Sequence, residues 1–304
     1  MRLNLQQLKY ALEVANKGSI NEAAKSLFIS QPSLSNSIKE LEEEIKTIIF
    51  IRNNRGVTIS NEGARFLGYA RQVLQQFNML EEKYVNQTTM KQFFSVSTHH
   101  YTFTANAFVQ LVKEFGSSEY EFTLREAKTY EIIEDVSKLH SELGVIYLSN
   151  YNQDVIQKIL KDKNIIFTEL FHTSPHVFIN KDHPLAHQES IELDELDDYP
   201  RLSFEQGSHN SFYFSEEILS TRNVKKSIKV SDRAAIVNFM IGLEGYTISS
   251  GIFPRYLHGE EIIAVPLKVD ETIRIGIIKH KDLTLTDLGR IYQEELMEFS
   301  KAYK

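Results

Sequence analysis

The chain has 304 residues, of which 42% are hydrophobic and 25% charged, and it contains no cysteine. This length allows two or three domains with a large buried core, and the absence of cysteine excludes disulfides, thiolate metal sites and cysteine nucleophiles. No stretch approaches the roughly 18 uninterrupted apolar residues of a membrane span, and the start lacks the apolar core of a signal peptide. We therefore expect a cytoplasmic protein with no membrane partner.

The net charge of −7 is unevenly distributed. Residues 1–92 carry 12 Lys or Arg against 9 Asp or Glu, a net of +3, whereas residues 93–304 carry 22 against 32. This asymmetry is typical of a mildly basic nucleic-acid-binding module attached to an acidic body. Because non-specific affinity grows with the number of phosphates neutralised, a module of +3 is weak alone, so a homodimer or homotetramer is expected.

Three helices are predicted at the N-terminus. The first begins after Asn4, a good N-cap, and ends at Gly18. An S-x-x-E capping box at Ser19 and Glu22 starts the second, and Ser30 caps the third. The third helix has an apolar stripe at helical spacing, formed by Leu34, Ile38, Leu41 and Ile45.

The opposite face of the third helix carries short polar side chains. Gln and Asn can bond bidentately to adenine, and Ser can donate or accept, so this face suits a recognition helix in the DNA major groove. The candidate DNA-binding residues here are Ser30, Gln31, Pro32, Ser33, Asn36, Ser37 and Lys39. The pattern alone leaves open an ordinary solvated helix face.

Two short β-branched runs, Ile48–Ile51 and Val57–Ile59, flank a basic turn and predict a wing. Arg52 and Arg55 are the candidate contacts to phosphate or to the minor groove, with two solvated arginines as the alternative. A long helix then runs from Ser60 to about Val85. Its apolar stripe predicts a dimer seam formed by Leu67, Ala70, Leu74, Phe77, Leu80 and Tyr84.

Residues 23–42 match twelve positions of the run A-A-x-x-L-x-x-S-Q-P-S-L-S-x-x-I-x-x-L-E. The chain thus resembles the LysR-type transcriptional regulators in their winged helix-turn-helix, and the wing motif, with Phe50, Arg52, Gly56 and Gly63, agrees. Lys46 stands where the family usually has Gly, which predicts that the recognition helix runs on or ends less sharply. The resemblance implies a double-stranded DNA operator, a small-molecule effector and RNA polymerase as partners, with no cofactor.

Beyond residue 92 the pattern alternates between strands and helices, which predicts parallel strands joined by crossover helices. The predicted elements include a helix near 211–222 and a closing helix from Thr286 to about Ala302. The resemblance implies an α + α/β fold whose body is a two-lobed, type 2 periplasmic-binding-protein-like domain. The expected domains are 1–60 (winged helix-turn-helix), 61–91 (dimerisation linker helix and hinge) and 92–304 (effector binding), with lobe I at about 92–161 and 252–304 and lobe II at about 162–251.

In such domains the ligand lies between the lobes, near strand ends and helix N-termini that attract anions. Polar residues at these places are the effector-binding candidates: Thr98, His99, His100, Thr102, Thr129, Ser203 and Ser249, the last two by family resemblance. We expect a small anionic or zwitterionic metabolite, of amino-acid or sulfur metabolism.

Catalytic motifs are absent: the chain has no G-x-S-x-G, P-loop, G-x-G-x-x-G or H-E-x-x-H, so no enzyme activity and no metal site are expected. The leading hypothesis is a bacterial DNA-binding regulator. The alternative is a solute-binding or enzymatic α/β protein whose helical N-terminus serves only for dimerisation.

Overall fold

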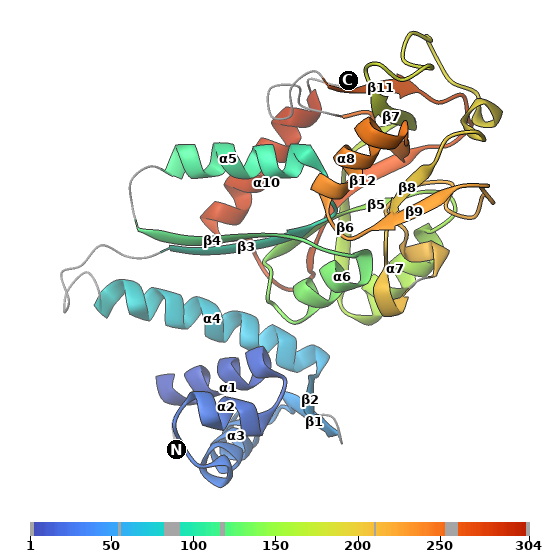
Figure 1. Cartoon of the computed structure of the whole chain (residues 1–304). Coiled ribbons are helices and arrows are strands. Elements are labelled where there is room, and N and C mark those ends of the chain that lie inside the picture. Colours follow the sequence, from blue (N-terminus) through green and yellow to red (C-terminus); the bar gives the residue numbers. More distant parts are fainter. Residues whose placement is uncertain are drawn as a thin grey trace.

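The computed structural model describes residues 3–53, 56–81, 92–115, 119–209, 211–252 and 261–301. Figure 1 shows a small helical domain at the N-terminus, one long helix above it, and a larger α/β body. The predicted DNA contact Arg55 and residues 82–91 of the predicted linker and hinge lie outside the described residues. Within the described part of the chain, no helix has the length and apolar composition needed to cross a bilayer.

The N-terminal domain packs three helices around one apolar core. They are α1 (Leu5–Lys17), α2 (Ile20–Ser26) and α3 (Gln31–Ile45). The predicted N-cap residues are confirmed: the side chains of Asn4, Ser19 and Ser30 each accept a backbone N–H of the first turn. Of the predicted capping box at Ser19 and Glu22 only the Ser19 half forms, because the Glu22 carboxylate accepts from Lys25 at 2.8 Å. Gly18, with φ 64°, ends α1 in the left-handed region. Each cap satisfies a polar group that has no partner inside the helix.

The prediction that α3 runs on past Lys46 was wrong. The helix ends at Ile45, and Lys46 itself takes the left-handed conformation (φ 54°) that glycine usually supplies. The N–H groups of Lys46 and Thr47 donate to carbonyls of the last turn, with Thr47 N 3.0 Å from Glu42 O. These bonds hold a backbone conformation that costs about 1–2 kcal/mol for a residue with a Cβ.

The wing is an antiparallel pair, β1 (Phe50–Asn53) and β2 (Gly56–Ile59). It is fixed to the helices at one end, where Val57 N donates to Gly18 O at 2.9 Å. A Cβ on Gly56 would collide with that carbonyl oxygen, so the close approach of the two segments requires glycine there.

Helix α4 (Asn61–Glu81) follows Ser60, whose Oγ accepts from Gly63 N at 2.8 Å. The predicted dimer seam is partly wrong, because Leu67, Ala70 and Leu74 are buried inside this chain and pack with residues of the N-terminal domain, Leu8 of α1 among them. Among the α4 side chains that the structure describes, the exposed large apolar ones are Tyr69, Val73 and Leu80. A helical period places two apolar stripes side by side on α4, and the sequence alone does not show which one faces its own domain.

Lobe I of the body is a five-stranded sheet in the order β4-β3-β5-β12-β6. The strands are β3 (Gln92–Thr98), β4 (Tyr120–Glu126), β5 (Leu143–Leu148), β6 (Ile165–Thr173) and β12 (Ile273–His280). As predicted, β3 pairs parallel with β4 and β5, whereas β12 is antiparallel to both of its neighbours. Helices α5 (Thr102–Phe115) and α10 (Asp287–Lys301) lie side by side on one face, and α6 (Thr129–Ser137) contacts β5 and β12 (Figure 1).

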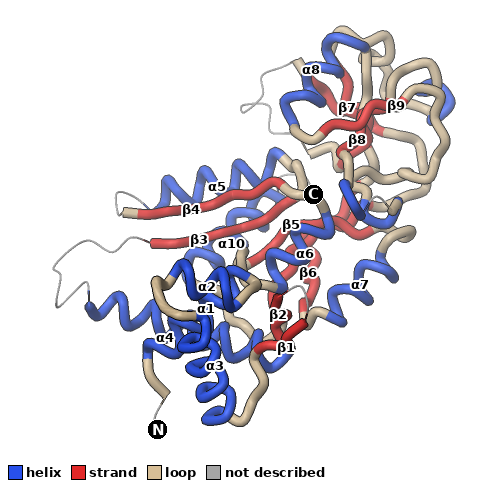
Figure 2. The backbone as a smooth tube through the Cα atoms, turned by 60° about the horizontal axis from the view of Figure 1, so that its bottom comes forward, coloured by secondary structure: helices blue, strands red, loops and turns tan. Residues whose placement is uncertain are grey.

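Lobe II contains the sheet β10-β7-β11 and the parallel pair β8-β9, with helix α8 packed against β7, β8 and β9. Figure 2 shows this lobe as a separate, loop-rich unit at one end of the lobe I sheet. Its elements are β7 (His176–Asn180), β8 (Arg201–Phe204), β9 (Ser227–Val230), α8 (Arg233–Leu243), β10 (Thr247–Ser249) and β11 (Ile262–Pro266).

The sheet pairing moves the predicted lobe boundaries. Strand β6 pairs with β12 in lobe I, although the boundary at 161/162 had placed it in lobe II. Strand β11 pairs with β7 in lobe II, although the boundary at 251/252 had placed it in lobe I. The chain therefore crosses between β6 and β7 and again between β11 and β12, because register pairing, not chain order, decides which lobe a strand joins.

Two helix predictions in the body need correction. Residues 211–222 form only a 3₁₀ turn at Phe212–Phe214 followed by bends and turns. The carbonyls of Ile218 and Leu219 both accept from the Arg201 guanidinium at 2.7 Å, and Leu219 O also accepts from Arg222 N at 3.1 Å. An unpredicted helix, α7 (Gln153–Asp162), buries Ile156 and Leu160 at i, i+4 spacing.

Candidate functional site

The N-terminal half of α3 presents a polar surface to solvent. Ser30, Gln31, Pro32, Ser33, Asn36 and Lys39 are exposed and Ser37 is half-buried, while Leu34, Ile38 and Leu41 fill the core beneath them. The structure thus brings all seven predicted residues of this helix to one end of the domain. Two are also tied locally, since Ser30 Oγ lies 2.7 Å from Ser33 Oγ and Lys39 pairs with Glu43 at 3.6 Å.

The wing lies beside α3. Arg52 is exposed, and its Nη1 donates to Ser35 Oγ on α3 at 3.1 Å. The Glu42 carboxylate accepts from the N–H groups of Ile49 (2.7 Å) and Phe50 (2.9 Å), where the chain enters the wing. Sequence reasoning did not find these two links, although Ser35 and Glu42 both belong to the matched motif. Helix and wing therefore form one rigid surface with an arginine at its edge.

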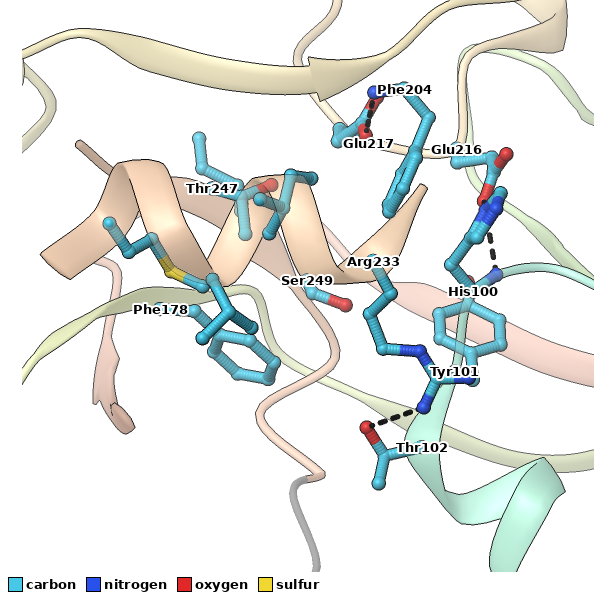
Figure 3. Close-up of a pocket in the computed structure, with 14 residues that line it drawn as sticks. His100, Tyr101, Thr102, Phe178, Phe204, Glu216, Glu217, Arg233, Thr247 and Ser249 are labelled. Carbon is cyan, nitrogen blue, oxygen red and sulfur yellow. Dashed lines mark hydrogen bonds and ion pairs between the residues drawn. The ribbon is translucent and has the colours of Figure 1, made fainter. Parts of the chain in front are cut away.

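The second candidate site is a cavity between the two lobes of the body, with about 560 Å³ of empty space including its open mouth. Lobe I contributes His100, Tyr101 and Thr102, at the start of α5. Lobe II contributes a polar group, Glu216, Glu217, Arg233, Thr247 and Ser249, and two aromatic rings, Phe178 and Phe204, all labelled in Figure 3. Its aliphatic lining consists of Ile236, Val237, Met240 and Ile248. Mostly apolar walls with a few convergent polar groups are usual for a small-molecule site.

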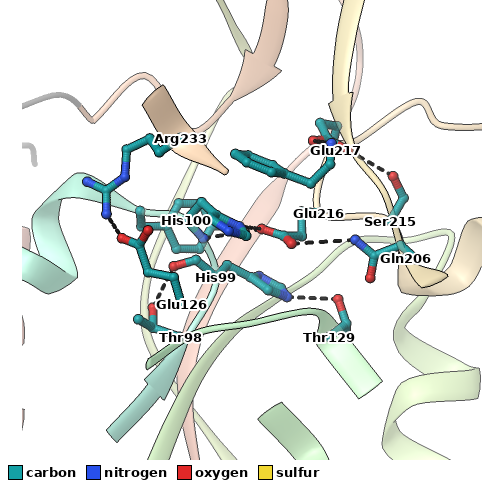
Figure 4. A network of polar contacts seen from close by, with 12 residues as sticks. Thr98, His99, His100, Glu126, Thr129, Gln206, Ser215, Glu216, Glu217 and Arg233 are labelled. Carbon is teal, nitrogen blue, oxygen red and sulfur yellow. Dashed lines mark hydrogen bonds and ion pairs between the residues drawn. The ribbon is translucent and has the colours of Figure 1, made fainter. Parts of the chain in front are cut away.

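Polar contacts cross from lobe to lobe around this cavity (Figure 4). The His100 ring stacks on Phe204 at 3.8 Å between centroids, and His100 Nδ1 lies 2.9 Å from Glu216 Oε2. Arg233 forms an ion pair with Glu126 of lobe I, and Tyr147 OH donates to Ser215 O at 3.0 Å. These contacts hold the lobes together on the side of the cavity.

The predicted effector residues divide into three groups. His100, Thr102 and Ser249 line the cavity. Thr98, His99 and Thr129 are buried next to it and bonded to one another or to lobe II, so they position the cavity wall without lining it. Ser203 lines a different cavity, on the other face of β8. Its side chain points away because alternate residues of a strand face opposite sides.

His99 is held neutral. Thr129 Oγ1 donates to Phe214 O at 2.7 Å, so its contact with His99 Nε2 at 2.8 Å requires the imidazole to be the donor. Its Nδ1 has no hydrogen-bond partner among the described residues. Burial lowers the pKa of His99 to about 4. The neutral His99 therefore orients the Thr129 hydroxyl, which makes the bond to lobe II.

The pKa of Glu217 is shifted in the opposite direction to that of His99. Burial, followed by the charge of Glu216, raises the pKa of Glu217 to about 7, against an ordinary value of 4.5. Its oxygens accept from Phe204 N at 2.8 Å and from Ser215 Oγ at 3.0 Å. A carboxyl group at the cavity that is close to half protonated at neutral pH would become fully ionised beside a bound cation.

His99 and Glu217 make opposite contributions to the pH dependence of the folding stability. The stabilisation associated with protonated Glu217 is fully present below pH 4.5 and is lost as the pH rises toward 7. The stabilisation associated with neutral His99 is present above pH 6.5 and is lost as the pH falls toward 4. We expect the stability of Glu217→Gln, relative to the unmodified protein, to increase from pH 4.5 to 7, as measured by urea unfolding.

An exposed carboxylate provides the control for this measurement. Glu189→Gln changes a solvent-facing residue far from the cavity in sequence, and its stability difference should stay constant across the same pH window. A difference for Glu217→Gln that is equally constant would contradict the assignment of Glu217 as the titrating group.

The charged residues that line the interlobe cavity were not predicted from the sequence. Glu216 and Glu217 lie in the segment predicted as a helix, and Arg233 follows the cap of α8 with no motif around it. His172 and His176, four residues apart in sequence, lie on the different strands β6 and β7. The described residues hold no group of three or more His, Asp or Glu able to bind a metal.

A helix-turn-helix with a wing, joined by a long helix to a two-lobed domain with an interlobe cavity, is the architecture of a ligand-responsive DNA-binding regulator. Residues 5–64 match the bacterial regulatory helix-turn-helix protein of the lysR family, and residues 100–294 match the LysR substrate binding domain. The chain belongs to the LysR family of bacterial transcriptional regulators, which are not enzymes, and this removes the solute-binding or enzymatic alternative.

Known relatives and structures agree with this assignment. The uncharacterized HTH-type transcriptional regulator YbhD of Escherichia coli is 26% identical over 295 residues, covering 94% of this chain and 88% of that protein. The HTH-type transcriptional regulator YvbU of Bacillus subtilis is 26% identical, covering 69% of each chain. A full-length OxyR variant from Pseudomonas aeruginosa has the same fold, with a TM-score of 0.59 at 16% identity over 97% of this chain and 95% of that one.

Proposed function

We propose that this regulator reads its operator through the exposed N-terminal half of α3, with Arg52 of the wing on the phosphate backbone or in the minor groove. The observation that carries the proposal is the joint surface of helix and wing, fixed by the Arg52–Ser35 and Glu42–wing contacts. Gln31 and Asn36 supply the donor and acceptor pairs that read base edges, whereas Arg52 supplies charge that does not depend on sequence.

Gln31→Ala and Ser33→Ala are expected to weaken binding to the promoter region of the protein's own gene by about 1–3 kcal/mol each, roughly tenfold to hundredfold, measured by mobility shift. Binding to unrelated DNA should change little, because the phosphate contacts remain. Gln6→Ala, an exposed glutamine on α1, is the matched control and should bind normally. Undiminished specific binding by both α3 variants would remove the recognition role from this helix.

For the effector we propose a small zwitterion of the amino-acid type, sulfur-containing amino acids included. Arg233, Thr102 and the N-terminus of α5 offer positive charge and N–H groups to a carboxylate. Glu217, ionised by a neighbouring cation, suits an ammonium group, and the apolar wall of Phe178, Ile236 and Met240 suits an aliphatic side chain.

A thermal-shift screen of amino acids on the full-length protein tests this proposal, because a ligand raises the apparent stability by mass action. An amino acid that stabilises the protein is then compared with its matched carboxylic acid and its matched amine. We expect both analogues, and the variant Arg233→Gln, to lose about tenfold or more in affinity. Equal binding of the amine and the amino acid would exclude the carboxylate contact.

LysR-family regulators are oligomeric, and we propose that the exposed stripe of Tyr69, Val73 and Leu80 on α4 forms the dimer seam. Two copies would place two modules of +3 on one partly palindromic operator. Contact with RNA polymerase remains a prediction from the family.

A further inference from the structure

A second cavity lies in lobe II, on the face of β8 and β9 that is turned away from the lobe's apolar core. It has about 1070 Å³ of empty space including its open mouth. Phe204 contributes to both cavities, but no other residue lines both. The proposed effector residues Arg233 and Thr102 are not part of this second cavity.

The two strands divide their side chains cleanly between the faces. Leu202, Val230 and their neighbours pack into a core with α8, whereas the cavity face carries Arg201, Ser203, Ser227 and Lys229. In the parallel register Arg201 is opposite Ser227 and Ser203 is opposite Lys229. Cations and hydroxyls therefore alternate across the strands, with the two positive charges on one face.

Neither Arg201 nor Lys229 has a carboxylate partner within ion-pair distance among the described residues. Arg222, a third cation that lines the cavity, pairs with Asp197 at 2.8 Å and with Asp194 at 3.4 Å. Arg201 is 5% exposed, and its guanidinium donates to the carbonyls of Ile218 and Leu219, which are uncharged. The nearest acidic influences are Glu217, whose raised pKa leaves it only partly ionised at neutral pH, and Glu205, which already pairs with Lys128 at 2.5 Å. Arg201 is a buried cation without a counter-ion, which is costly, and an anion in the cavity would offset that cost. Lys229 is exposed and adds a second positive charge to the same face.

The rim adds neutral hydrogen-bond donors. Ser203 and Ser227 on the strands, and Ser211 and Thr221 on the covering loop, line the cavity with hydroxyls that are half-buried (Ser203) or exposed (the other three). Hydroxyl donors around two cations match a tetrahedral oxyanion, which needs several donors at once. We propose that this cavity is a second ligand site, specific for a phosphate or sulfate group, free or carried by a metabolite.

Calorimetry on the full-length protein tests this site with inorganic phosphate and with glucose 6-phosphate, against chloride at equal ionic strength. We expect saturable binding, weakened about tenfold or more by Lys229→Gln, since a hydrogen bond to a charged group contributes about 1.5–3 kcal/mol. Ser227→Ala is a second, milder variant that leaves the charge in place and should weaken binding in the same direction. Tighter binding of glucose 6-phosphate than of phosphate would identify a phosphorylated metabolite as the source.

Two matched variants separate this site from the alternatives. Lys225→Gln removes an exposed lysine near the cavity that does not line it, and Arg233→Gln removes the arginine of the interlobe cavity. Both should bind phosphate normally. Three results would overturn the proposal. If Arg233→Gln lost phosphate binding while Lys229→Gln kept it, the anion would lie between the lobes. If Lys225→Gln weakened binding as much as Lys229→Gln, the effect would be one of diffuse charge, and if phosphate bound no better than chloride, there would be no site.

Discussion

Replacing Glu42 with alanine is expected to destabilise the N-terminal domain by about 2–4 kcal/mol and to abolish specific DNA binding. The Glu42 carboxylate accepts from two backbone N–H groups, of Ile49 and Phe50, and both lose their partner in the variant. Ile49 and Phe50 are buried, so water replaces that carboxylate poorly. The same contact fixes the wing against α3. In the alanine variant we therefore expect the wing to separate from α3 at a temperature below that of global unfolding.

Urea unfolding followed by far-UV circular dichroism, together with mobility shift, measures both parts of this effect. Glu42→Gln keeps one acceptor oxygen and should lose less than alanine. Glu43→Ala is the matched control, because Glu43 is exposed and its only ion pair in the described structure is a 3.6 Å surface contact with Lys39. Such a pair contributes less than about 1 kcal/mol. Equal stability of the alanine variants at 42 and 43 would show that the two N–H groups find other partners.

Gly63→Ala is expected to have a comparable or larger effect. Gly63 lies in the first turn of α4, where a Cβ would collide with Ile49 O and would come within 2.8 Å of Ile49 Cα. Both are backbone atoms at the entry to the wing, so neither can rotate away. We expect a loss of about 3 kcal/mol or more, typical of overpacking against a rigid neighbour, and loss of DNA binding.

Gly68→Ala in the same helix is the control for Gly63→Ala. Its Cβ would also meet a neighbour, but the nearest atoms belong to the Leu283 side chain of the body, which can change rotamer. We therefore expect a near-native N-terminal domain in Gly68→Ala, checked by the same unfolding and binding measurements. If Gly63→Ala bound DNA as well as Gly68→Ala, the wing would be shown to accommodate the extra methyl group.

Local signals predicted much of the DNA-binding domain. Asn4, Ser19, Ser30 and Gly18 each act on a neighbour within a few residues, so the sequence contains the whole interaction. Lys46 was misjudged although the bonds around it are also local: its N–H and that of Thr47 donate to carbonyls of the last turn, and they form with a lysine where glycine is usual.

The effector site was less predictable. His100 and Thr102 follow a strand, and the fold class alone predicts ligand-binding residues at such a position. Both line the cavity. Glu216 and Glu217 reach the cavity from irregular chain and Arg233 from α8, and the carbonyls just after the two glutamates are bonded to Arg201, 17 and 18 residues away in sequence. Such contacts span many residues of sequence and leave no periodic signature.

The contact between Gly56 and Gly18 bears on how this protein can be recombined with its relatives. The wing cannot be exchanged independently of the helices, because Gly56, the first residue of β2, approaches the end of α1 too closely for any side chain. A chimera that grafts a new wing must carry glycine at 56 and keep the backbone of the α1–α2 turn. The smallest segment that can be exchanged to change operator specificity is therefore the whole segment from α1 to β2. This constrains both laboratory design and the natural recombination of such modules.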